Sequence, residues 1–263
     1  MARSSLKNVI RLLDEVQETL PPEQGFLKDL ERSIELTDKK NARKPSQMYK
    51  PSSMQCIRNM YYQRSGIEQD PEEGSYVRVG ICNSGSDIHV RIQTAVTEMK
   101  SNGMDCEYVD VAEFVKNREL KDIDIVSKQG METKLRHNVY HLSFLCDGII
   151  KYKNRYYVLE LKTETVNKWF PRQGVDPSHY DQATAYSVAF DLDNVIFVYI
   201  NRDTLDMKSY MFTPTSDQKN ELIGKLVDCE GYVERKIAPP KPTGLHKKVC
   251  SYCRYKTECR KDG

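Results

Sequence analysis

Two strand-like runs joined by a short turn constrain the fold of this chain more than any other feature. Residues 139–150 and residues 155–163 are mostly apolar, and the residues KYKN between them predict a tight turn. This pattern is typical of a β-hairpin. Because helical patterns precede and follow the hairpin, the sequence predicts a mixed α/β core flanked by helices.

Three ionisable residues interrupt the predicted hairpin. Asp147 lies in the first run, and Glu160 and Lys162 lie two apart in the second run. The period of two in a strand places Glu160 and Lys162 on one face, and Leu159 and Leu161 on the other. Burying such charges is costly unless they pair or hold a metal ion. A surface ion pair between Glu160 and Lys162, with Asp147 in a turn, is the alternative interpretation.

Metal-dependent hydrolysis would explain the three residues together. Carboxylate oxygens are ligands that suit Mg²⁺ or Mn²⁺. Such an ion would polarise a phosphodiester and lower the pKa of a bound water. Lys162 could orient or help to deprotonate that water, and could stabilise negative charge that develops on the phosphate. Asp147, Glu160 and Lys162 are therefore the first candidates for catalytic residues.

Helical and strand patterns extend through the rest of the chain. The spacing of apolar residues predicts helices over 6–20, 26–36, 79–100, 178–190 and 216–233, and a short helix that begins after an N-cap at Ser52 or Ser53. Apolar runs predict further strands over 195–200 and 207–212. Residues 105–130 fit no single pattern. A proline-rich linker, APPKPTG, leads to a cysteine-bearing tail.

The composition is that of an ordinary soluble chain, with 39% hydrophobic and 30% charged residues. No apolar run approaches the roughly 20 residues that a bilayer span needs, and the N-terminus is unlike a signal peptide. We therefore expect a cytoplasmic protein with no membrane partner. The 40 basic residues nearly balance the 38 acidic ones, so binding to nucleic acid would need a local basic patch.

Two further patterns extend the candidate site. His89 follows Gly85 and Asp87 in a helical segment, and its imidazole could be an additional metal ligand, although a single histidine is more often structural. Gln182 and Tyr186 are four residues apart on a predicted helix, so they share one face. They could hydrogen-bond to a phosphate or to the catalytic lysine, or they could form an ordinary polar face.

The order of these parts, G-x-x-x-H, D-G, E-x-K and Q-x-x-x-Y, resembles the RecB-like branch of the PD-(D/E)XK nucleases over roughly residues 52–260. The resemblance implies a restriction-endonuclease-like core with a mixed central sheet flanked by helices. It implies catalytic roles for Asp147, Glu160, Lys162, Gln182 and Tyr186, with metal binding by His89, Asp147 and Glu160. One departure is that Cys146 precedes the aspartate, where the family often has proline or glycine.

Three of the eight cysteines stand close together in the tail VCSYCRYKTEC, at Cys250, Cys253 and Cys259. Three thiols fill only part of a tetrahedral site, so a fourth ligand must come from elsewhere. Cys56 as the fourth ligand suggests a Cys₄ iron–sulfur cluster, whereas His246 suggests a Cys₃His zinc site. A disulfide or free thiols are the remaining interpretation.

One cysteine before the core and three after it resemble the layout of the Cas4-like iron–sulfur nucleases. The resemblance implies a [4Fe–4S] cluster on Cys56, Cys250, Cys253 and Cys259. That cluster would close a nuclease domain of residues 51–263, which follows an N-terminal helical extension of residues 1–50. The implied source of such a protein is a bacterium, an archaeon or a phage.

The implied function is that of a DNA exonuclease acting with Mg²⁺ or Mn²⁺ on single strands or duplex ends. A Cas4-like adaptor subunit, which binds DNA for an integration or recombination complex with weak or no cleavage, is the alternative. A third reading is a zinc-stabilised, catalytically silent protein that binds nucleic acid. The N-terminal extension is interpreted as a docking element for a protein partner or for a second copy of the chain.

Residues that could contact DNA lie in three places. Basic residues gather over 39–50 and over 247–261, and a metal cluster that joins Cys56 to the tail would bring these two groups into one surface. Trp169, Phe170 and Arg172 follow the catalytic strand directly. They could form a stacking wedge for a single strand, or equally a packed loop.

Overall fold

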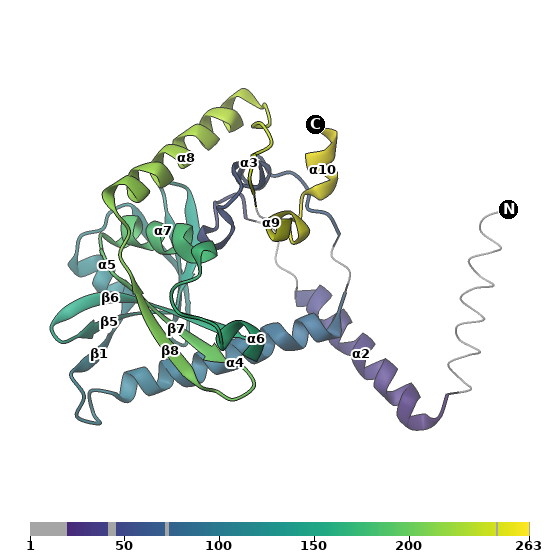
Figure 1. Ribbon diagram of the computed structural model, residues 1–263, viewed down its shortest axis with the longest axis horizontal. Coiled ribbons are helices and arrows are strands. Elements are labelled where there is room, and N and C mark those ends of the chain that lie inside the picture. The colour runs from purple at the N-terminus through teal and green to yellow at the C-terminus, as the bar shows by residue number, and fades with distance from the viewer. Residues whose placement is uncertain (1–19, 42–45, 72–73, 246, 263) are drawn as a thin grey trace. The chain divides into compact units, whose positions relative to one another are not determined.

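The computed structural model describes residues 20–41, 46–71, 74–245 and 247–262 (Figure 1). The chain divides into two compact units. The first comprises Met1–Lys44 and Glu72–Ser84, and the second comprises Pro45–Pro71 and Gly85–Gly263. No helix of the described ranges is long and apolar enough to cross a membrane.

In the first unit, the main described element is helix α2 (Pro22–Asn41), which confirms the helix predicted over 26–36. Pro22 begins this helix. The first N–H groups of a helix have no partner within it, so a proline costs no hydrogen bond at that position. The carboxylate of Glu35 accepts a hydrogen bond from the backbone N–H of Tyr76, at 3.1 Å. The helix predicted over residues 6–20 lies outside the described residues, apart from residue 20 itself.

The second unit is built on a five-stranded mixed sheet in the order β1-β5-β6-β7-β8. The pair β6–β7 is parallel and the other three pairs are antiparallel. The strands are β1 (Cys106–Val109), β5 (Gly148–Tyr152), β6 (Arg155–Glu164), β7 (Val195–Asn201) and β8 (Met207–Phe212). The strands predicted over 155–163, 195–200 and 207–212 are thus confirmed.

A tight turn joins β5 to β6, as the KYKN segment predicts. Lys153 and Asn154 both have positive φ angles, 47° and 64°. Two successive residues of this kind form the type I′ turn, whose twist matches that of a two-stranded ribbon. The register that follows places Gly148 opposite Leu159 and Ile150 opposite Tyr157.

A second, antiparallel sheet has the order β2-β3-β4, with β2 (Ile123–Gln129), β3 (Glu132–His137) and β4 (Leu142–Cys146). Only Asp147 separates β4 from β5. The prediction of one strand over 139–150 is therefore wrong in part, because this segment changes sheets at Asp147. Part of residues 105–130, which fit no pattern, forms β1, helix α5 (Val111–Asn117) and β2.

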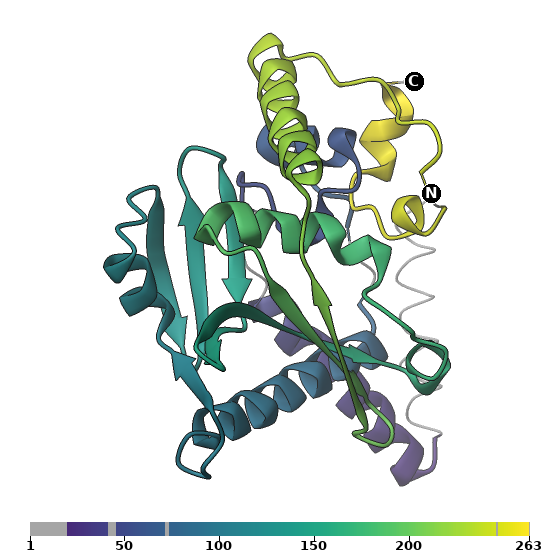
Figure 2. The ribbon, with the colours of Figure 1, turned by 60° about the vertical axis from the view of Figure 1, so that its left-hand side comes forward.

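Helices cover both faces of the five-stranded sheet (Figure 2). Ile88 and Ile92 of α4 (Tyr76–Glu98) pack in one apolar cluster with Leu159 and Leu161 of β6. Helices α7 (Tyr180–Phe190) and α8 (Ser216–Arg235) belong to the core on the opposite face. These helices confirm the patterns predicted over 79–100, 178–190 and 216–233.

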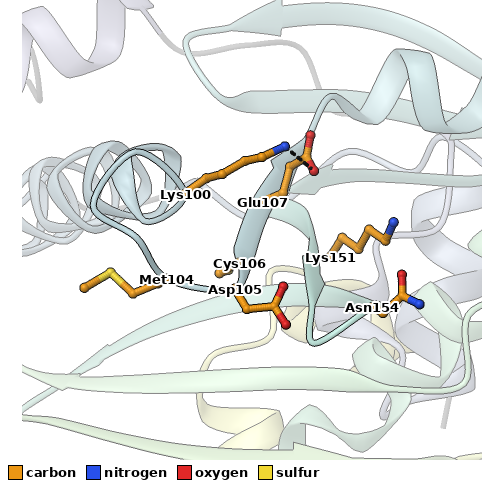
Figure 3. A pocket seen from close by; sticks show the side chains of 7 residues that line it. All are labelled: Lys100, Met104, Asp105, Cys106, Glu107, Lys151 and Asn154. Carbon is orange, nitrogen blue, oxygen red and sulfur yellow. Dashed lines mark ion pairs between the residues drawn. The ribbon is translucent and has the colours of Figure 1, made fainter.

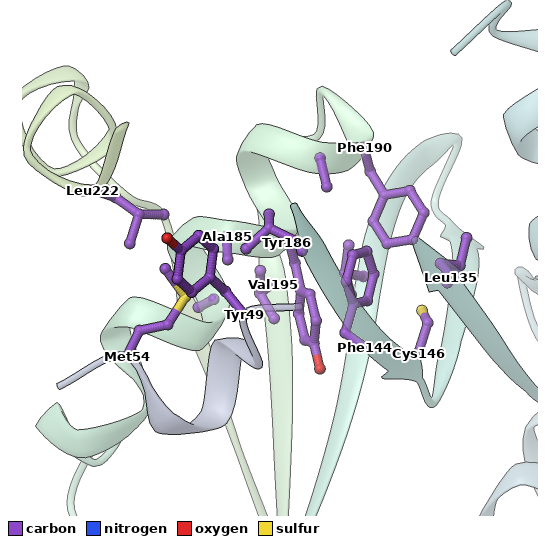
Figure 4. Packing of buried hydrophobic residues seen from close by; sticks show 14 of the residues in the cluster. Tyr49, Met54, Leu135, Phe144, Cys146, Ala185, Tyr186, Phe190, Val195 and Leu222 are labelled. Atoms are coloured by element: carbon purple, nitrogen blue, oxygen red, sulfur yellow. The ribbon is translucent and has the colours of Figure 1, made fainter. Parts of the chain in front are cut away.

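Aromatic rings fill the larger core and hold α7 in place (Figure 4). The ring of Tyr186 lies 5.2 Å from that of Phe144 in β4, and the ring of Phe190 lies 5.7 Å from Phe144 at a right angle. Such ring pairs add stabilisation beyond the area they bury. They fix the side of α7 that carries Gln182 and Tyr186.

The cysteine-bearing tail packs beside helix α3 (Ile57–Arg64), nearly 200 residues away in sequence. Short helices α9 (Lys247–Ser251) and α10 (Lys256–Lys261) form this tail. Arg58 donates a hydrogen bond to the carbonyl of Asp262 at 2.8 Å, and the hydroxyl of Tyr62 lies 2.7 Å from its carboxylate. These contacts close the second unit upon itself.

The beginning of α3 differs from its prediction. Pro51 starts a short 3₁₀ helix (Pro51–Ser53), so Ser52 and Ser53 lie inside that turn and the N-cap of α3 is Cys56. The pyrrolidine ring fixes φ near the helical value, which favours a turn that begins at the proline itself. The remaining short elements are α6 (Val166–Trp169) and a 3₁₀ helix, η2 (Pro177–His179).

Candidate active site

Asp147 lies at the junction of the two sheets, where both its backbone and its side chain are held. Its Oδ2 atom accepts the backbone N–H of Leu161 at 2.8 Å, and its carbonyl accepts Nε2 of Gln93 at 2.7 Å. The Oδ1 atom lies 3.3 Å from Nδ1 of His89. Gln93 is one helical turn after His89 on α4, so two side chains of that helix hold the aspartate from one side.

Glu160 and Lys162 project from the same face of β6, as the alternation of the strand predicts. Glu160 is only 4% exposed, and its Oε1 atom accepts from Lys162 Nζ at 2.6 Å and from Gln182 Nε2 at 2.7 Å. Its Oε2 atom is buried and has no hydrogen-bond partner in the described structure. An unpartnered carboxylate oxygen in a core is costly, because it has lost its hydration and has gained no hydrogen bond in exchange. This oxygen is suited to a cation.

Gln182 and Tyr186 form the third side of the site. Oε1 of Gln182 accepts from Lys162 Nζ at 2.9 Å, and Nε2 of Gln182 also lies 2.7 Å from the hydroxyl of Tyr186. That hydroxyl donates to the carbonyl of Leu145 at 3.2 Å. One amide thus orients both the carboxylate and the ammonium on β6, while the tyrosine orients the amide.

Burial and neighbouring charges shift the protonation of the site. Burial raises the pKa of Glu160 to about 7; Lys162 opposes this shift and Asp147 adds to it. For His89, burial lowers the pKa, but the hydrogen bond to Asp147 and the charges of Asp147 and Glu160 together raise it above its usual value. The rise at His89 reports the negative charge of its carboxylate neighbours, whereas the rise at Glu160 reports mainly its burial.

A cation could be held by residues from three separate parts of the chain. Ligand atoms of His89, Glu132 and Asp147 all lie within 4.8 Å of one another. Of the three metal ligands expected from the sequence, His89 and Asp147 belong to this group and Glu160 does not. The Oε1 atom of Glu160 is bonded to Lys162 and Gln182, and the charge of Glu160 contributes to the raised pKa of His89.

Three residues of this region were not singled out in the sequence. Gln93 could have been found by its spacing of four from His89, since that spacing puts both on one helix face. His179 directly precedes the helix that carries Gln182. Burial and then the charge of Lys162 lower its pKa. Glu132 offered no local signal, because no helix or strand was predicted over residues 131–138.

The loop after β6 is rigidly fixed beside the site. Arg172 is bonded to Glu164 at 2.5 Å and 2.7 Å, and its guanidinium lies 4.1 Å from the centre of the Tyr199 ring. Trp169 donates its indole N–H to the carbonyl of Tyr199 at 3.0 Å. Of the predicted wedge, Trp169 and Arg172 are therefore packed, while Phe170 is 77% exposed.

The four cysteines expected to bind a cluster belong to the two segments that pack together. Cys56 begins α3, while Cys250 and Cys259 lie in α9 and α10. Burial is the largest cause that raises the pKa of Cys56, and the thiols of Cys253 and Cys250 add to it. The backbone N–H groups of Arg58 and Asn59 oppose the rise by hydrogen bonding to its sulfur.

Nitrogen donors also point at the sulfurs of the tail. Asn59 Nδ2 and the backbone N–H of Tyr255 each lie 3.4 Å from Cys253 Sγ, and Arg58 Nη1 lies 3.6 Å from Cys259 Sγ. Such donors stabilise thiolates and tune the clusters that thiolates bind. These contacts suit a metal–thiolate site.

In the described ranges, no three of these thiols come within 4.8 Å of one another. His246, the alternative fourth ligand, lies outside the described residues.

The basic groups of the tail are partly used in internal contacts. Arg254 donates to the carbonyl of Asp70 at 3.0 Å, and Lys261 pairs with Glu258 at 2.7 Å. Lys39 and Lys40 belong to the first unit, and Arg43 and Lys44 lie outside the described residues. A joint basic surface over 39–50 and 247–261 stays a prediction.

A separate hollow of about 360 Å³ lies near the end of α4 and β1 (Figure 3). Its lining includes the ion pair of Lys100 and Glu107, whose atoms approach to 2.8 Å. None of the carboxylate, histidine or amide groups described above lines it. The hollow is therefore distinct from the candidate active site.

Comparisons with known proteins give the following. No family model and no curated protein matches the sequence. The structure resembles the crystal structure of SSO0001, with 15% identity over 91% of this chain and 98% of that one and a TM-score of 0.48. It also resembles LHK-Exo in complex with dAMP, with 9% identity over 73% of this chain and 90% of that one and a TM-score of 0.40.

A further structure of LHK-Exo, an alkaline exonuclease from Laribacter hongkongensis, shows 10% identity over 73% of this chain and 90% of that one, with a TM-score of 0.39. All three TM-scores are below 0.5 and all three identities are low. Likenesses of this degree assign no chemistry to this chain.

Proposed function

We propose that this chain is a divalent-metal-dependent deoxyribonuclease of the RecB-like PD-(D/E)XK type, which hydrolyses single strands or exposed duplex ends. The observation that carries the proposal is the state of Glu160. This buried carboxylate contacts Lys162 through one oxygen, and its other oxygen has no partner. A cation beside Asp147 and Glu160 would satisfy that oxygen, and a purely structural ion pair would not leave it bare.

The residues present fit Mg²⁺ or Mn²⁺. His89, Asp147 and Glu160 would hold the ion, because hard oxygen ligands and one imidazole suit these metals. When bound, such an ion supplies Lewis acidity and a water of lowered pKa.

The chain's own residues divide the remaining work. The ammonium of Lys162 is placed to donate to a phosphate oxygen or to the attacking water, because Glu160 and Gln182 fix its direction. Gln182 keeps Lys162 from rotating away, and Tyr186 keeps Gln182 in place. Gln93 holds the backbone of Asp147, so its carboxylate keeps one orientation.

We propose further that Cys56, Cys250, Cys253 and Cys259 bind a [4Fe–4S] cluster. The support is the packing of α3 against the tail and the donors that point at the sulfurs of Cys253 and Cys259. Because the two segments are far apart in sequence, the cluster would stabilise the fold by closing a long loop.

The nuclease proposal is tested with labelled linear DNA, single-stranded and double-stranded, incubated with Mn²⁺. The wild type is compared with Glu160→Ala, Lys162→Ala and the control Ser187→Ala. Ser187 lies on α7 with a buried hydroxyl that has no partner in the described structure, so its loss should be silent. We expect metal-dependent degradation by the wild type and the control, and none by the other two.

Two outcomes would overturn the proposal. DNA binding without cleavage by the wild type would favour an adaptor that presents DNA ends to a partner complex. Cleavage that survives in both Glu160→Ala and Lys162→Ala would mean that the chemistry lies elsewhere in the chain.

A further inference from the structure

The imidazole of His179 lies beside the ionisable pair of β6, although it comes from the short helix η2 that precedes α7. Its ring stacks on Phe197 at 5.9 Å with an interplanar angle of 11°, and on Tyr199 at 5.9 Å with an angle of 20°. In the parallel pair β6–β7, Phe197 stands opposite Glu160 and Tyr199 opposite Lys162. Residues that stand opposite each other in paired strands project to the same face. His179 therefore covers the part of the sheet that carries the candidate catalytic pair.

A chain of hydrogen bonds fixes which nitrogen of His179 carries the proton. The backbone N–H of Asp176 donates to the hydroxyl oxygen of Tyr199 at 3.0 Å, and that oxygen lies 2.9 Å from Nδ1 of His179. Among the described residues, no other acceptor is available for the proton of this hydroxyl. The hydroxyl therefore donates to Nδ1, so Nδ1 is the unprotonated nitrogen of the ring.

The other nitrogen of the ring is then a fixed donor. Burial, followed by the charge of Lys162, lowers the pKa of His179 to about 4, so the ring is neutral near neutral pH. A neutral imidazole with an unprotonated Nδ1 carries its proton on Nε2. No group in the described part of the chain accepts a hydrogen bond from Nε2, and the side chain is only part-buried. A ligand atom can therefore reach this N–H group.

The charges around the ring favour an anion as the acceptor. After burial, the charge of Lys162 is the largest cause that lowers the pKa of His179, and Arg172 and Lys168 add to it. Asp176 opposes them, but its carboxylate already accepts two hydrogen bonds at the start of η2 and one from Arg172. These surroundings disfavour a cation. A phosphate oxygen suits them, because it can accept from Nε2–H while it lies close to an ammonium.

We infer that His179 contacts the substrate directly, by donating its Nε2–H group to a phosphate oxygen of the nucleic-acid strand beside Lys162. For its substrate this inference rests on the proposed function, whereas the fixed tautomer does not depend on it. A donor whose direction is already set costs no reorganisation when the phosphate arrives. Tyr199 acts only through His179 and is a positioning residue.

The tautomer can be determined on the full chain. Long-range nitrogen–proton NMR spectra distinguish a protonated from an unprotonated ring nitrogen, and the signals of His179 are those that disappear in His179→Gln. Near neutral pH we expect a protonated Nε2 and an unprotonated Nδ1 in the wild type. A short single-stranded oligodeoxynucleotide, added with Ca²⁺ in place of Mn²⁺ to slow cleavage, should shift the Nε2 proton. In Tyr199→Phe the ring should populate both tautomers.

Cleavage of single-stranded DNA with Mn²⁺ tests the contact itself. His179→Phe keeps a ring that can stack on Phe197 and Tyr199 but has no donor, whereas His179→Gln keeps an N–H group at a similar reach. We expect kcat/KM to fall by about 10- to 150-fold in His179→Phe, the range for losing a hydrogen bond to a charged group. His179→Gln should stay within about threefold of the wild type. Unfolding midpoints at neutral pH show whether each variant is folded.

Three results would overturn the inference: a protonated Nδ1 in the wild type, a folded His179→Phe that cleaves as fast as the wild type, or a folded His179→Gln that is as slow as His179→Phe. Should His179→Phe fail to fold, the spectra with the oligodeoxynucleotide decide. If the wild type cleaves DNA but the Nε2 proton does not shift, the nuclease stands and the contact falls. If that proton shifts but the wild type never cleaves DNA, the contact stands and the nuclease falls.

Discussion

Lys162 and Glu160 stand two residues apart on β6, and the Nζ atom of Lys162 lies 2.6 Å from Oε1 of Glu160. The lysine is part-buried and the glutamate fully buried, so each limits the cost of burying the other. The pair is not symmetrical in the proposed chemistry, because only the carboxylate can ligate a cation.

This asymmetry separates the effects of two substitutions. We expect Lys162→Met to lower the rate of DNA cleavage by about 10²- to 10⁴-fold while Mn²⁺ binding stays near that of the wild type. Glu160→Gln should weaken Mn²⁺ binding as well as cleavage. Calorimetric Mn²⁺ titration and single-turnover cleavage measure the two quantities. Loss of Mn²⁺ binding in Lys162→Met would contradict the assignment.

Gln182 should act by positioning its neighbours. It bonds Glu160, Lys162 and Tyr186, so Gln182→Ala frees the lysine and leaves the carboxylate one donor short. We expect a fall in kcat of about 10- to 100-fold with little change in KM for DNA, as for groups that orient metal ligands. Ser187→Ala, on the same helix, is the control. An unchanged kcat in Gln182→Ala would refute the role.

The tail cysteines give a prediction with a visible signal. Anaerobically purified protein should be brown, with broad absorbance near about 400 nm. Cys56→Ser should lose this colour and unfold at a lower temperature, because the cluster no longer joins α3 to the tail. Cys82→Ser, an exposed cysteine of the first unit, should keep both properties. Colourless wild-type protein with stoichiometric zinc would exclude the cluster.

Phe170 should contact bases of a single strand. Arg172 and Trp169 fix the loop, and Lys208 bonds the carbonyl of Phe170 at 2.9 Å, so the backbone that carries the exposed ring is held in place. Stacking on one base contributes about 1–3 kcal/mol. Phe170→Ala should therefore weaken binding of single-stranded DNA by about 5- to 150-fold, measured by fluorescence anisotropy.

The control for this loop is Phe170→Trp, which keeps a ring and should keep the affinity. The unfolding midpoint of Phe170→Ala should not change, since the side chain is mostly exposed. Equal affinity of Phe170→Ala and the wild type for single strands would mean that the ring does not touch DNA.

His179 should make stability depend on pH. Its ring stacks on Phe197 and Tyr199, and Nδ1 lies 2.9 Å from the hydroxyl of Tyr199. Burial, followed by the charge of Lys162, lowers the pKa of His179 to about 4. In the unfolded chain the pKa is near its ordinary value of about 6.5.

Between these values the unfolded state binds more protons, so the contribution of His179 is present above about pH 6.5 and is lost as pH falls toward 4. We expect the wild type to lose on the order of 2 kcal/mol more than His179→Gln over this range. Urea unfolding at several pH values measures the difference. Parallel stability curves for the two proteins would contradict it.

The sequence predicted well those features that depend on local periodicity. Alternation along β6 put Glu160 and Lys162 on one face, and the spacing of four put Gln182 and Tyr186 on one face of α7. Both relations hold because strand and helix geometry fix them within a few residues. The tight turn at KYKN follows from the same kind of local rule.

Features that depend on strand pairing were beyond the sequence. Nothing local marks Asp147 as the residue where the chain leaves one sheet for another. The approach of Glu132 to Asp147 follows from the register between β3 and β4, which the sequence of either strand alone does not determine. The N-cap of α3 was misplaced because the turn begun by Pro51 competes with the serines that follow it.

The change of sheet at Asp147 also limits which length changes this gene could tolerate. Residues 142–146 and 148–152 each alternate between two faces, in different sheets. Inserting or deleting one residue on either side of Asp147 would move the side chains of one strand to the opposite face of its sheet, or would move the carboxylate out of the site. Insertions and deletions among homologous chains should therefore avoid this stretch of eleven residues and collect at turns such as the one at Lys153 and Asn154.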